Sequence, residues 1–317
     1  MKRFGVASTM GVLAMALCLT CPLAFSSAQA QAPTASSEEA RQAELAAAWR
    51  AAENAGTKGP AQIKLIDQAA LDVPAEYFFV PKTEGMRVMR ALGNTIYEPS
   101  FQGIVIGLRP SDQWIVVVRH IKEGYIKDDD AKNWNADDLL QNLKDGTAEA
   151  NKDRAARGFP ELEVIGWVEK PAYDSATHRL VWSLMNKHKG ESDGAVHGIN
   201  YNTYALGRDG YFSLNLLTNS NRIVADKAAA HTLLAALTYN AGKRYEDFNA
   251  STDHIAEYGI AALVGGVAAK KLGLFALIGV FVVKFGKVLA LAGAAALAGL
   301  WKLFGRKRPA SQSDGTA

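Results

Sequence analysis

Residues 258–304 form an almost continuously apolar stretch that is rich in glycine and alanine. Five lysines interrupt it, namely Lys270, Lys271, Lys284, Lys287 and Lys302. A membrane-spanning helix needs about 20 residues, and a lysine at the bilayer centre costs roughly 3 kcal/mol. The lysines are therefore expected near the bilayer interfaces. We predict that residues 251–305 are a helical membrane-anchoring segment, so the remainder of the chain must fold as a domain held beside a bilayer.

The number of membrane crossings is open between two interpretations. A basic cluster at residues 306–308 begins the polar tail 306–317, and positive charge favours the cytoplasmic side. A single span places this cluster in the cytoplasm and the domain outside. A helical hairpin that turns at residues 284–287 fits the spacing equally well and leaves the cluster outside. Small residues at 293–299 could let such helices approach closely, so a homo-oligomer through this segment is a further alternative.

Residues 1–30 have the composition of a cleaved export signal. A basic start precedes an apolar run at residues 12–23, and Ala28 and Ala30 are small residues where a signal peptidase needs them. These features predict cleavage after Ala30. Together with the anchor, they predict a bacterial inner-membrane protein whose main domain is periplasmic.

Cysteine content and charge exclude several classes of protein. Cys18 and Cys21 are the only cysteines and lie inside the predicted signal, so a mature chain would contain no disulfide and no catalytic thiol. The formal net charge is +3, and basic residues near the two ends belong to the signal and the membrane flank. Nothing in this distribution indicates a nucleic-acid surface.

The sequence pattern between the predicted signal and the predicted anchor indicates an α+β domain. Hairpins form an antiparallel sheet in it, and helices are inserted between the hairpins. The exported domain is expected at residues 61–250, after a linker and N-terminal helix at residues 31–60. The apolar face of that helix is mostly alanine, with Leu45 and Trp49 four residues apart. We expect it to be a loosely docked lid or a spacer.

Turn residues and hydrophobic periodicity give the expected elements. Helices are expected over residues 84–94, 136–157 and 225–239. In the last predicted strand Phe212, Leu214 and Leu216 alternate with more polar residues, which predicts one buried and one solvated face. The strands are expected at residues 61–66, 70–80, 101–108 and 113–121, and in two later hairpins at residues 162–187 and 200–218.

Several long phrases together resemble a known bacterial family. They are GYIKDDDAKNWNADDLLQNLKDG, LEVIGWVEKPAYDSATHRLVWSL, NYNTYALGRDGYFSLNL and GKRYEDFNASTDHIAEYGIAALVGGVAAKKLGL. The chain resembles the membrane-anchored proteins that are grouped by a domain of unknown function, from about residue 61 into the lysine-punctuated region. The resemblance implies an exported domain held at the inner membrane by its C-terminal segment. It implies no established activity and no functional residues.

Three consecutive aspartates, Asp128, Asp129 and Asp130, are the first candidate site. An EF-hand loop needs a glycine at its sixth position and a glutamate at its twelfth, but counting from Asp128 these positions hold Asn133 and Leu139. Two interpretations are left. The aspartates form a solvated turn that favours the positive end of the next helix, or some of them form a looser oxygen site. We predict no metal site and no cofactor.

The second candidate site is the hairpin that contains NYNTY and GRDGY. Its tyrosines, asparagines and Arg-Asp pair could bind a glycan or peptide by stacking and amide hydrogen bonds. Alternatively, they are cross-strand pairs on a solvated sheet face. The candidate residues are Asn200, Tyr201, Asn202, Tyr204, Arg208 and Asp209.

No catalytic template is present, since the sequence contains no GxSxG elbow, no P-loop and no HExxH zinc motif. We therefore predict a binding or scaffolding domain displayed outside the inner membrane, and the question of enzymatic activity stays open. The expected partners are the lipid bilayer and envelope proteins or cell-wall components. The alternative is an envelope hydrolase that uses the acidic cluster at Asp128, Asp129 and Asp130.

Overall fold

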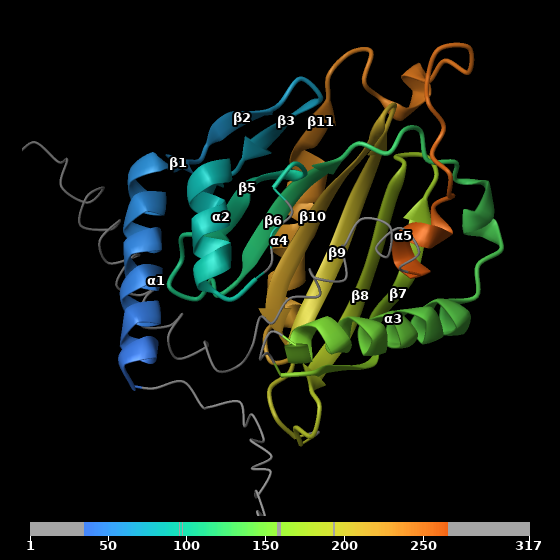
Figure 1. The fold of residues 1–317 in the computed structure, drawn as a ribbon. Helices are drawn as coiled ribbons and strands as arrows, with labels where there is room; N and C mark the ends of the chain where they lie inside the picture. Colours follow the sequence, from blue (N-terminus) through green and yellow to red (C-terminus); the bar gives the residue numbers. More distant parts are fainter. Residues whose placement is uncertain (1–34, 95, 97, 157–159, 193, 266–317) are drawn as a thin grey trace, which may run out of the picture.

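The computed structural model describes residues 35–265 of the 317, apart from residues 95, 97, 157–159 and 193 (Figure 1). The predicted export signal, most of the predicted anchor and the polar tail lie outside the described residues. Among the helices that the structure describes, none is long and apolar enough to cross a bilayer.

An eight-stranded antiparallel sheet forms the centre of the domain, with strand order β1-β4-β5-β6-β10-β9-β8-β7. A second antiparallel sheet has the order β11-β3-β2. The large sheet contains β1 (Thr57–Lys58), β4 (Tyr77–Pro81), β5 (Phe101–Gly107), β6 (Ile115–Ile121), β7 (Leu162–Asp174), β8 (Arg179–His188), β9 (Gly198–Gly207) and β10 (Gly210–Asn219). The small sheet contains β2 (Ala61–Leu65), β3 (Ala69–Val73) and β11 (Leu237–Tyr239).

The predicted hairpins are present as β5–β6, β7–β8 and β9–β10, so the α+β class with an antiparallel sheet is confirmed. The pairing that joins the first hairpin to the later ones is between β6 and β10, with Arg119 opposite Ser213 and Ile121 opposite Tyr211. These residues are about ninety positions apart in the sequence. Local turn chemistry could therefore not predict this contact.

One face of the large sheet is covered by α4 (Ile223–Ala236) and by the small sheet. Tyr201, Phe212 and Leu214 are fully buried there, together with Val116 and Val118. We call this cluster the α4 core. Full burial of one such aliphatic or aromatic side chain contributes about 1.5–3 kcal/mol.

The opposite face is covered by two separate groups of helices (Figure 1). α1 (Ala35–Ala55) and α2 (Lys82–Ala91) pack over β4 and β5, and their apolar side chains form the α1–α2 core. α3 (Ala136–Ala156) packs over β7 and contacts α5 (Ala261–Gly265), and this group forms the α3–α5 core. The middle strands β6, β10 and β9 lie between the two groups.

The first helix is not a loosely docked lid or spacer, contrary to the prediction. Leu45 and Trp49 are only 2% and 7% exposed, and Ala48 and Ala52 are fully buried. Its small alanine face permits close approach to α2. The helix therefore contributes to the α1–α2 core.

Three further expectations are wrong in detail. The strand expected at residues 70–80 is interrupted after Val73 and forms β3 and β4. The helix expected at residues 225–239 ends at Ala236, because Leu237–Tyr239 pairs with β3 as β11. The half-solvated face expected for β10 does not exist, since every residue from Gly210 to Thr218 is buried.

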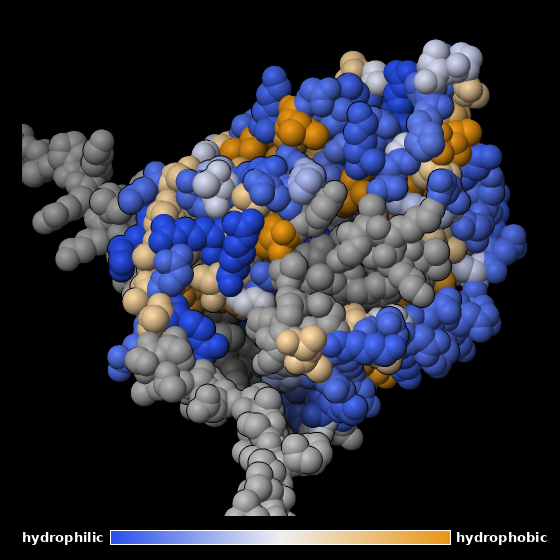
Figure 2. Space-filling view, viewed as in Figure 1, coloured by the Kyte–Doolittle hydropathy of each residue, from blue (hydrophilic) through white to orange (hydrophobic). Residues whose placement is uncertain are grey.

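Large apolar side chains that are exposed are few within the described part of the chain. They are Ile66, Ile165, Val224 and Ile255. Figure 2 shows a mainly hydrophilic surface along α3 and the loops beside it. These scattered residues give no contiguous apolar docking surface.

Candidate functional site

The three aspartates lie in a turn that holds the last described segment of the chain. Asp129–Lys132 forms a 3-10 turn, η1. The two carboxylate oxygens of Asp130 accept hydrogen bonds from the backbone N–H groups of Ile260 and Ala261, each at 3.1 Å. Asp130 thus caps the start of α5, which follows directly.

Backbone hydrogen bonds extend this contact. Tyr125 N–H donates to His254 O at 2.8 Å, Ala256 N–H donates to Tyr125 O at 2.9 Å, and Ile260 N–H donates to Lys127 O at 3.0 Å. Together with the Asp130 cap, they form what we call the acidic clamp, in which residues 124–130 hold residues 254–261.

Gly124 is required at the start of the acidic clamp. It has φ +89°, and a Cβ atom there would lie 2.6 Å from His254 O. Only glycine has both the left-handed backbone and the space for this approach. The clamp is therefore a close backbone-to-backbone contact.

Asp128 takes part in a different contact from Asp130. Its Oδ2 accepts a hydrogen bond from the Tyr173 hydroxyl at 2.7 Å. That hydroxyl lies 3.0 Å from His178 Nδ1, which is itself 3.7 Å from Asp128 Oδ2. Burial and the Asp128 carboxylate raise the pKa of Tyr173, so its hydroxyl stays protonated. The Asp128 and His178 side chains are about one quarter exposed.

Four rings stack beside this contact. The ring centroids are 4.0 Å apart for His178 and Tyr245, 4.4 Å for Tyr245 and Tyr125, and 3.9 Å for Tyr125 and Phe248. Tyr245 belongs to η2 (Tyr245–Asp247), and its hydroxyl donates to Ile126 O at 2.7 Å. The stacked rings and this hydrogen bond therefore connect η2 to the acidic clamp.

The three aspartates do not converge on one point. Asp128 binds Tyr173 and Asp130 binds the backbone of residues 260 and 261, whereas the Asp129 side chain is exposed. Among the described residues, no group of three or more His, Cys, Asp or Glu side chains is placed to hold a metal ion.

The candidate residues of the β9–β10 hairpin do not form an exposed surface. Asn200, Tyr201, Asn202 and Tyr204 are all buried, with at most 9% exposure. The expected alternative, cross-strand pairs on a solvated face, is wrong for the same reason. α4 packs against one face of β9, and Tyr204 on the other face belongs to the α3–α5 core; sequence periodicity alone cannot locate these neighbours.

Tyr201 and Tyr204 point to opposite faces of the sheet. The Tyr201 hydroxyl lies on the α4 side, 2.9 Å from Glu169 Oε2 and 2.8 Å from His231 Nε2. Burial and the Glu169 carboxylate raise the pKa of Tyr201. Tyr204 belongs to the α3–α5 core, where its ring lies 5.6 Å from that of Tyr211.

Arg208 and Asp209 at the tip of the hairpin make separate ion pairs. Arg208 donates to both carboxylate oxygens of Asp253, at 2.7 and 2.8 Å, which holds the pKa of Asp253 well below its usual range. Asp209 lies 3.3 Å from Lys122 Nζ. Like the acidic clamp, the Arg208–Asp253 pair fastens the segment that precedes α5.

The structure also reveals a polar strip that the sequence analysis missed. Strand register and core membership place six polar side chains on the sheet face that lies between the two helix groups. The period of two in residues 200–202 and 213–215 could have indicated it, because their polar residues alternate with more apolar ones. We define the amide strip as Arg119, Asn186, Asn200, Asn202, Ser213 and Asn215.

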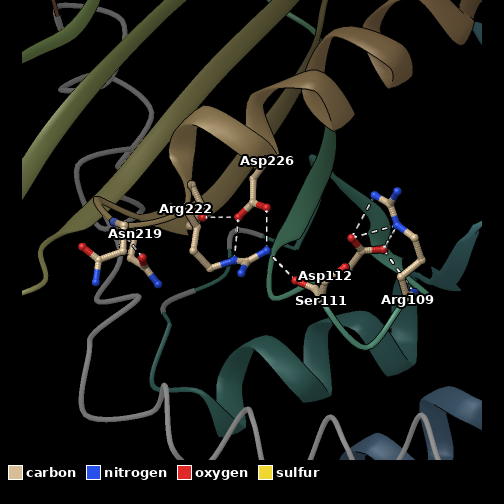
Figure 3. A network of polar contacts seen from close by, with 8 residues as sticks. Arg109, Ser111, Asp112, Asn219, Arg222 and Asp226 are labelled. Atoms are coloured by element: carbon tan, nitrogen blue, oxygen red, sulfur yellow. Dashed lines mark hydrogen bonds and ion pairs between the residues drawn. The ribbon is translucent and has the colours of Figure 1, made fainter.

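A charged network at the start of α4 is fully paired and has a structural role (Figure 3). Arg222 pairs with the buried Asp226 at 3.0 Å and also donates to Ser111 O in the β5–β6 turn. Asp226 additionally accepts from Thr218 at 2.6 Å. The network links α4 to β10 and to the β5–β6 turn, and it leaves neither Arg222 nor Asp226 free for a ligand.

Comparisons with known proteins give a family but no activity. Residues 57–294 match the family described as "Protein of unknown function (DUF2167)". No curated protein matches. One similar solved structure is the solution structure of cyanobacterial PsbP (CyanoP) from Synechocystis sp. PCC 6803, with 12% identity and a TM-score of 0.32. The similarity covers 58% of this chain and 91% of that chain, and at this level it supports no argument about function.

Proposed function

The chain belongs to this family of unknown function, DUF2167, and we propose that it is an exported binding or scaffolding protein anchored in the bacterial inner membrane. Its α+β domain is displayed on the periplasmic side, and its partners are envelope proteins or cell-wall components. The predicted export signal at residues 1–30 and the apolar stretch at residues 258–304 support this assignment.

The observation that carries the proposal is the acidic clamp. It fastens residues 254–261 to the domain immediately before the apolar stretch continues. The Arg208–Asp253 pair adds a second attachment just upstream. A domain joined to its anchor in this way is held close to the membrane with a restricted orientation, as a scaffold for neighbouring envelope components requires.

A topology experiment tests this proposal. Alkaline phosphatase and a fluorescent protein that folds only in the cytoplasm are each fused after residue 250 of the chain. We expect phosphatase activity without fluorescence, and the full chain should stay in the membrane pellet after alkaline carbonate extraction. Fluorescence of the fusion, or release of the full chain by carbonate, would contradict the proposal.

A second candidate function is an envelope hydrolase, which the Asp128–Tyr173–His178 contact favours. A carboxylate, a hydroxyl and an imidazole within hydrogen-bonding range, about one quarter exposed, are groups that acid–base catalysis uses. Here Asp128, rather than the whole acidic cluster, would act on a substrate.

The test of this candidate uses chromogenic esters and glycosides with the full-length chain. Asp128→Asn is expected to abolish any hydrolysis, whereas Asp129→Asn is expected to retain it, since the Asp129 side chain is exposed and outside the contact. Equal activity in the two variants would exclude Asp128 as a catalytic residue.

A further inference from the structure

We propose that the edge strand β2 pairs with β2 of a second copy of this chain, antiparallel about a two-fold axis at Ile63. The pairing joins the small sheets of the two copies into one continuous sheet. The inference goes beyond the proposed function and rests on it in one respect, because anchoring in one membrane concentrates the copies.

Among the described residues, β2 is the least protected edge of the two sheets. The four edge strands are β1, β7, β11 and β2, of which β1 has two residues and β11 three. β7 is longer, but its register with β8 shifts at three places and it contains Lys170 and Pro171. Such irregularities, charges and prolines keep an edge from pairing. β2 has five residues in regular register with β3 and contains no proline.

The outer side of β2 is open to another strand. In the part of the chain that the structure describes, the backbone of residues 61–64 is hydrogen-bonded to β3 alone. Alternate residues of an edge strand direct their N–H and C=O groups away from the sheet, where they pair readily with another strand. Figure 1 shows β2 at the upper rim of the molecule.

The turn after β2 presents an exposed apolar side chain on a strained backbone. Ile66 has φ +50° and is 45% exposed, although a β-branched residue rarely adopts the left-handed conformation. The turn is held in place, because Asp67 O accepts a hydrogen bond from the Asn240 side chain at 2.8 Å and Asp67 Oδ2 lies 3.0 Å from Lys243 Nζ. Neither the strain nor the exposure of Ile66 stabilises the isolated domain, which indicates a contact with another molecule.

A two-fold pairing centred on Ile63 is self-complementary and overlaps all five residues of β2. Opposite residues of an antiparallel pair lie on the same face. On the more buried face, Ile63 lies opposite Ile63 of the second copy, and Ala61 lies opposite Leu65 of the second copy. On the exposed face, Gln62 lies opposite Lys64 of the second copy. A register shifted by one residue instead places apolar residues opposite polar ones.

The exposed row also matches in charge, which favours a second copy over an unrelated strand. Gln62 donates to Asp72 Oδ1 at 2.8 Å, and the two residues are directly opposite each other on β2 and β3. Lys64 of the second copy is the next side chain in this row, so its ammonium group approaches Asp72 across Gln62. Ile66 follows at the end of the strand pair, opposite the exposed Pro60 of the second copy.

The size of this contact explains why anchoring matters. Stable complexes of soluble proteins bury about 1,200–2,000 Å², and a five-residue strand pair is a short contact by comparison. Residence in one membrane raises the effective concentration of the copies without any new contact. We therefore expect the pair in membranes.

Disulfide crosslinking of the full-length chain tests the register. Cys18→Ala and Cys21→Ala first remove the native cysteines. Gln62→Cys and Lys64→Cys are then placed on two differently tagged copies, which are expressed together. Membranes opened by freezing and thawing are oxidised with copper phenanthroline. The yield of product that carries both tags is compared with the yield when both tags carry the same substitution.

We expect the mixed pair to crosslink severalfold more than either variant with itself. Opposite residues have Cβ atoms about 4.5–5.5 Å apart, whereas the two Gln62 positions are diagonal, at about 7–8 Å, which is too far for a disulfide. Equal yields would show random collisions and overturn the proposal. A product of Gln62→Cys with a different protein, in place of the two-tag product, would overturn the assignment to a second copy.

The matched control uses the other long edge. Glu163 and Ile165 on β7 are both exposed and two residues apart, like Gln62 and Lys64 on β2. Glu163→Cys with Ile165→Cys should crosslink no more than either variant with itself. A yield as high as that of the β2 pair would mean that the assay does not report strand pairing, and would contradict the proposal.

Ile66→Asn separates the fold from the contact. Asparagine tolerates the left-handed backbone, so the melting temperature should rise, whereas the crosslinking yield of the β2 pair should fall because the contact with Pro60 is lost. The control is Val224→Asn, which changes an apolar side chain that is 86% exposed on α4 and should leave the yield unchanged. An unchanged yield in Ile66→Asn, or an equal fall in both variants, would contradict the proposal.

Carbonate extraction of the same membranes reports anchoring separately. A register-specific crosslink in a chain that carbonate releases would refute the proposed anchor and retain the strand pair. An anchored chain without this crosslink would refute the strand pair and retain the anchor.

Discussion

Substitution of Asp130 by alanine tests whether the acidic clamp is a specific contact. The change removes both carboxylate hydrogen bonds at the start of α5. Ile260 N–H keeps its bond to Lys127 O at 3.0 Å, so only Ala261 N–H loses its sole partner. Loss of a helix N-cap costs about 1 kcal/mol, which corresponds to a fall of roughly 2–4 °C in the melting temperature of a domain of this size.

The assay combines thermal unfolding, followed by tryptophan fluorescence, with limited proteolysis of the full-length chain. Cleavage between residues 254 and 265 should become faster in the Asp130→Ala variant, because opening of this segment requires less free energy. The control is Asp129→Ala, which changes the neighbouring exposed carboxylate and should alter stability by less than about 0.5 kcal/mol. Equal effects of the two substitutions would refute the assignment of the clamp to Asp130.

Three further predictions concern the core, a buried charge and pH. Leu45→Ala should lower the free energy of unfolding by about 2–5 kcal/mol in urea denaturation, since Leu45 is 2% exposed. A loss of less than about 0.5 kcal/mol would support the spacer interpretation of α1 instead. Asp226→Ala should lower the free energy of unfolding by about 3–5 kcal/mol, because it leaves Arg222 without its counter-charge. Arg87→Met, at the exposed pair with Glu44, should lower it by less than about 1 kcal/mol. Equal losses in the two variants would contradict this ranking. Burial lowers the pKa of His120 to about 4, so its neutral form favours folding above pH 6.5 and this stability is lost as the pH falls from 6.5 towards 4. His120→Gln should therefore flatten the dependence of the unfolding free energy on pH between 7 and 5, and an unchanged slope would exclude His120 as its source.

The hairpins and α3 could be predicted because their signals are local. The turn residues at 207–210 connect two strands that pair with each other, and the side-chain oxygen of Asn135 accepts a hydrogen bond from the N–H of Asp137 at the start of α3. Family membership was equally accessible, since long phrases match in order over much of the chain. These features depend on neighbours in the sequence.

The candidate sites required the tertiary structure. The alternation in NYNTY separates Tyr201 from Asn200 and Asn202 but does not indicate what covers either face. The packing of α4 buries Tyr201, and the α3–α5 core buries Tyr204, so the expected surface is not exposed in the folded domain. Likewise, the three aspartates are adjacent in sequence, but their roles differ because residues 173 and 260–261 approach from other parts of the chain.

The sequence by itself determined the antiparallel α+β class, the local hairpins, the family and the placement of an apolar stretch after the domain. The tertiary structure decided the pairing of β6 with β10, the burial of both faces of β9 and β10, and the juxtaposition of Arg119 with Asn215. The physical reason is that backbone preference and side-chain period act over a few residues. Burial, charge pairing and unsatisfied hydrogen bonds depend on segments that meet only when the chain is folded.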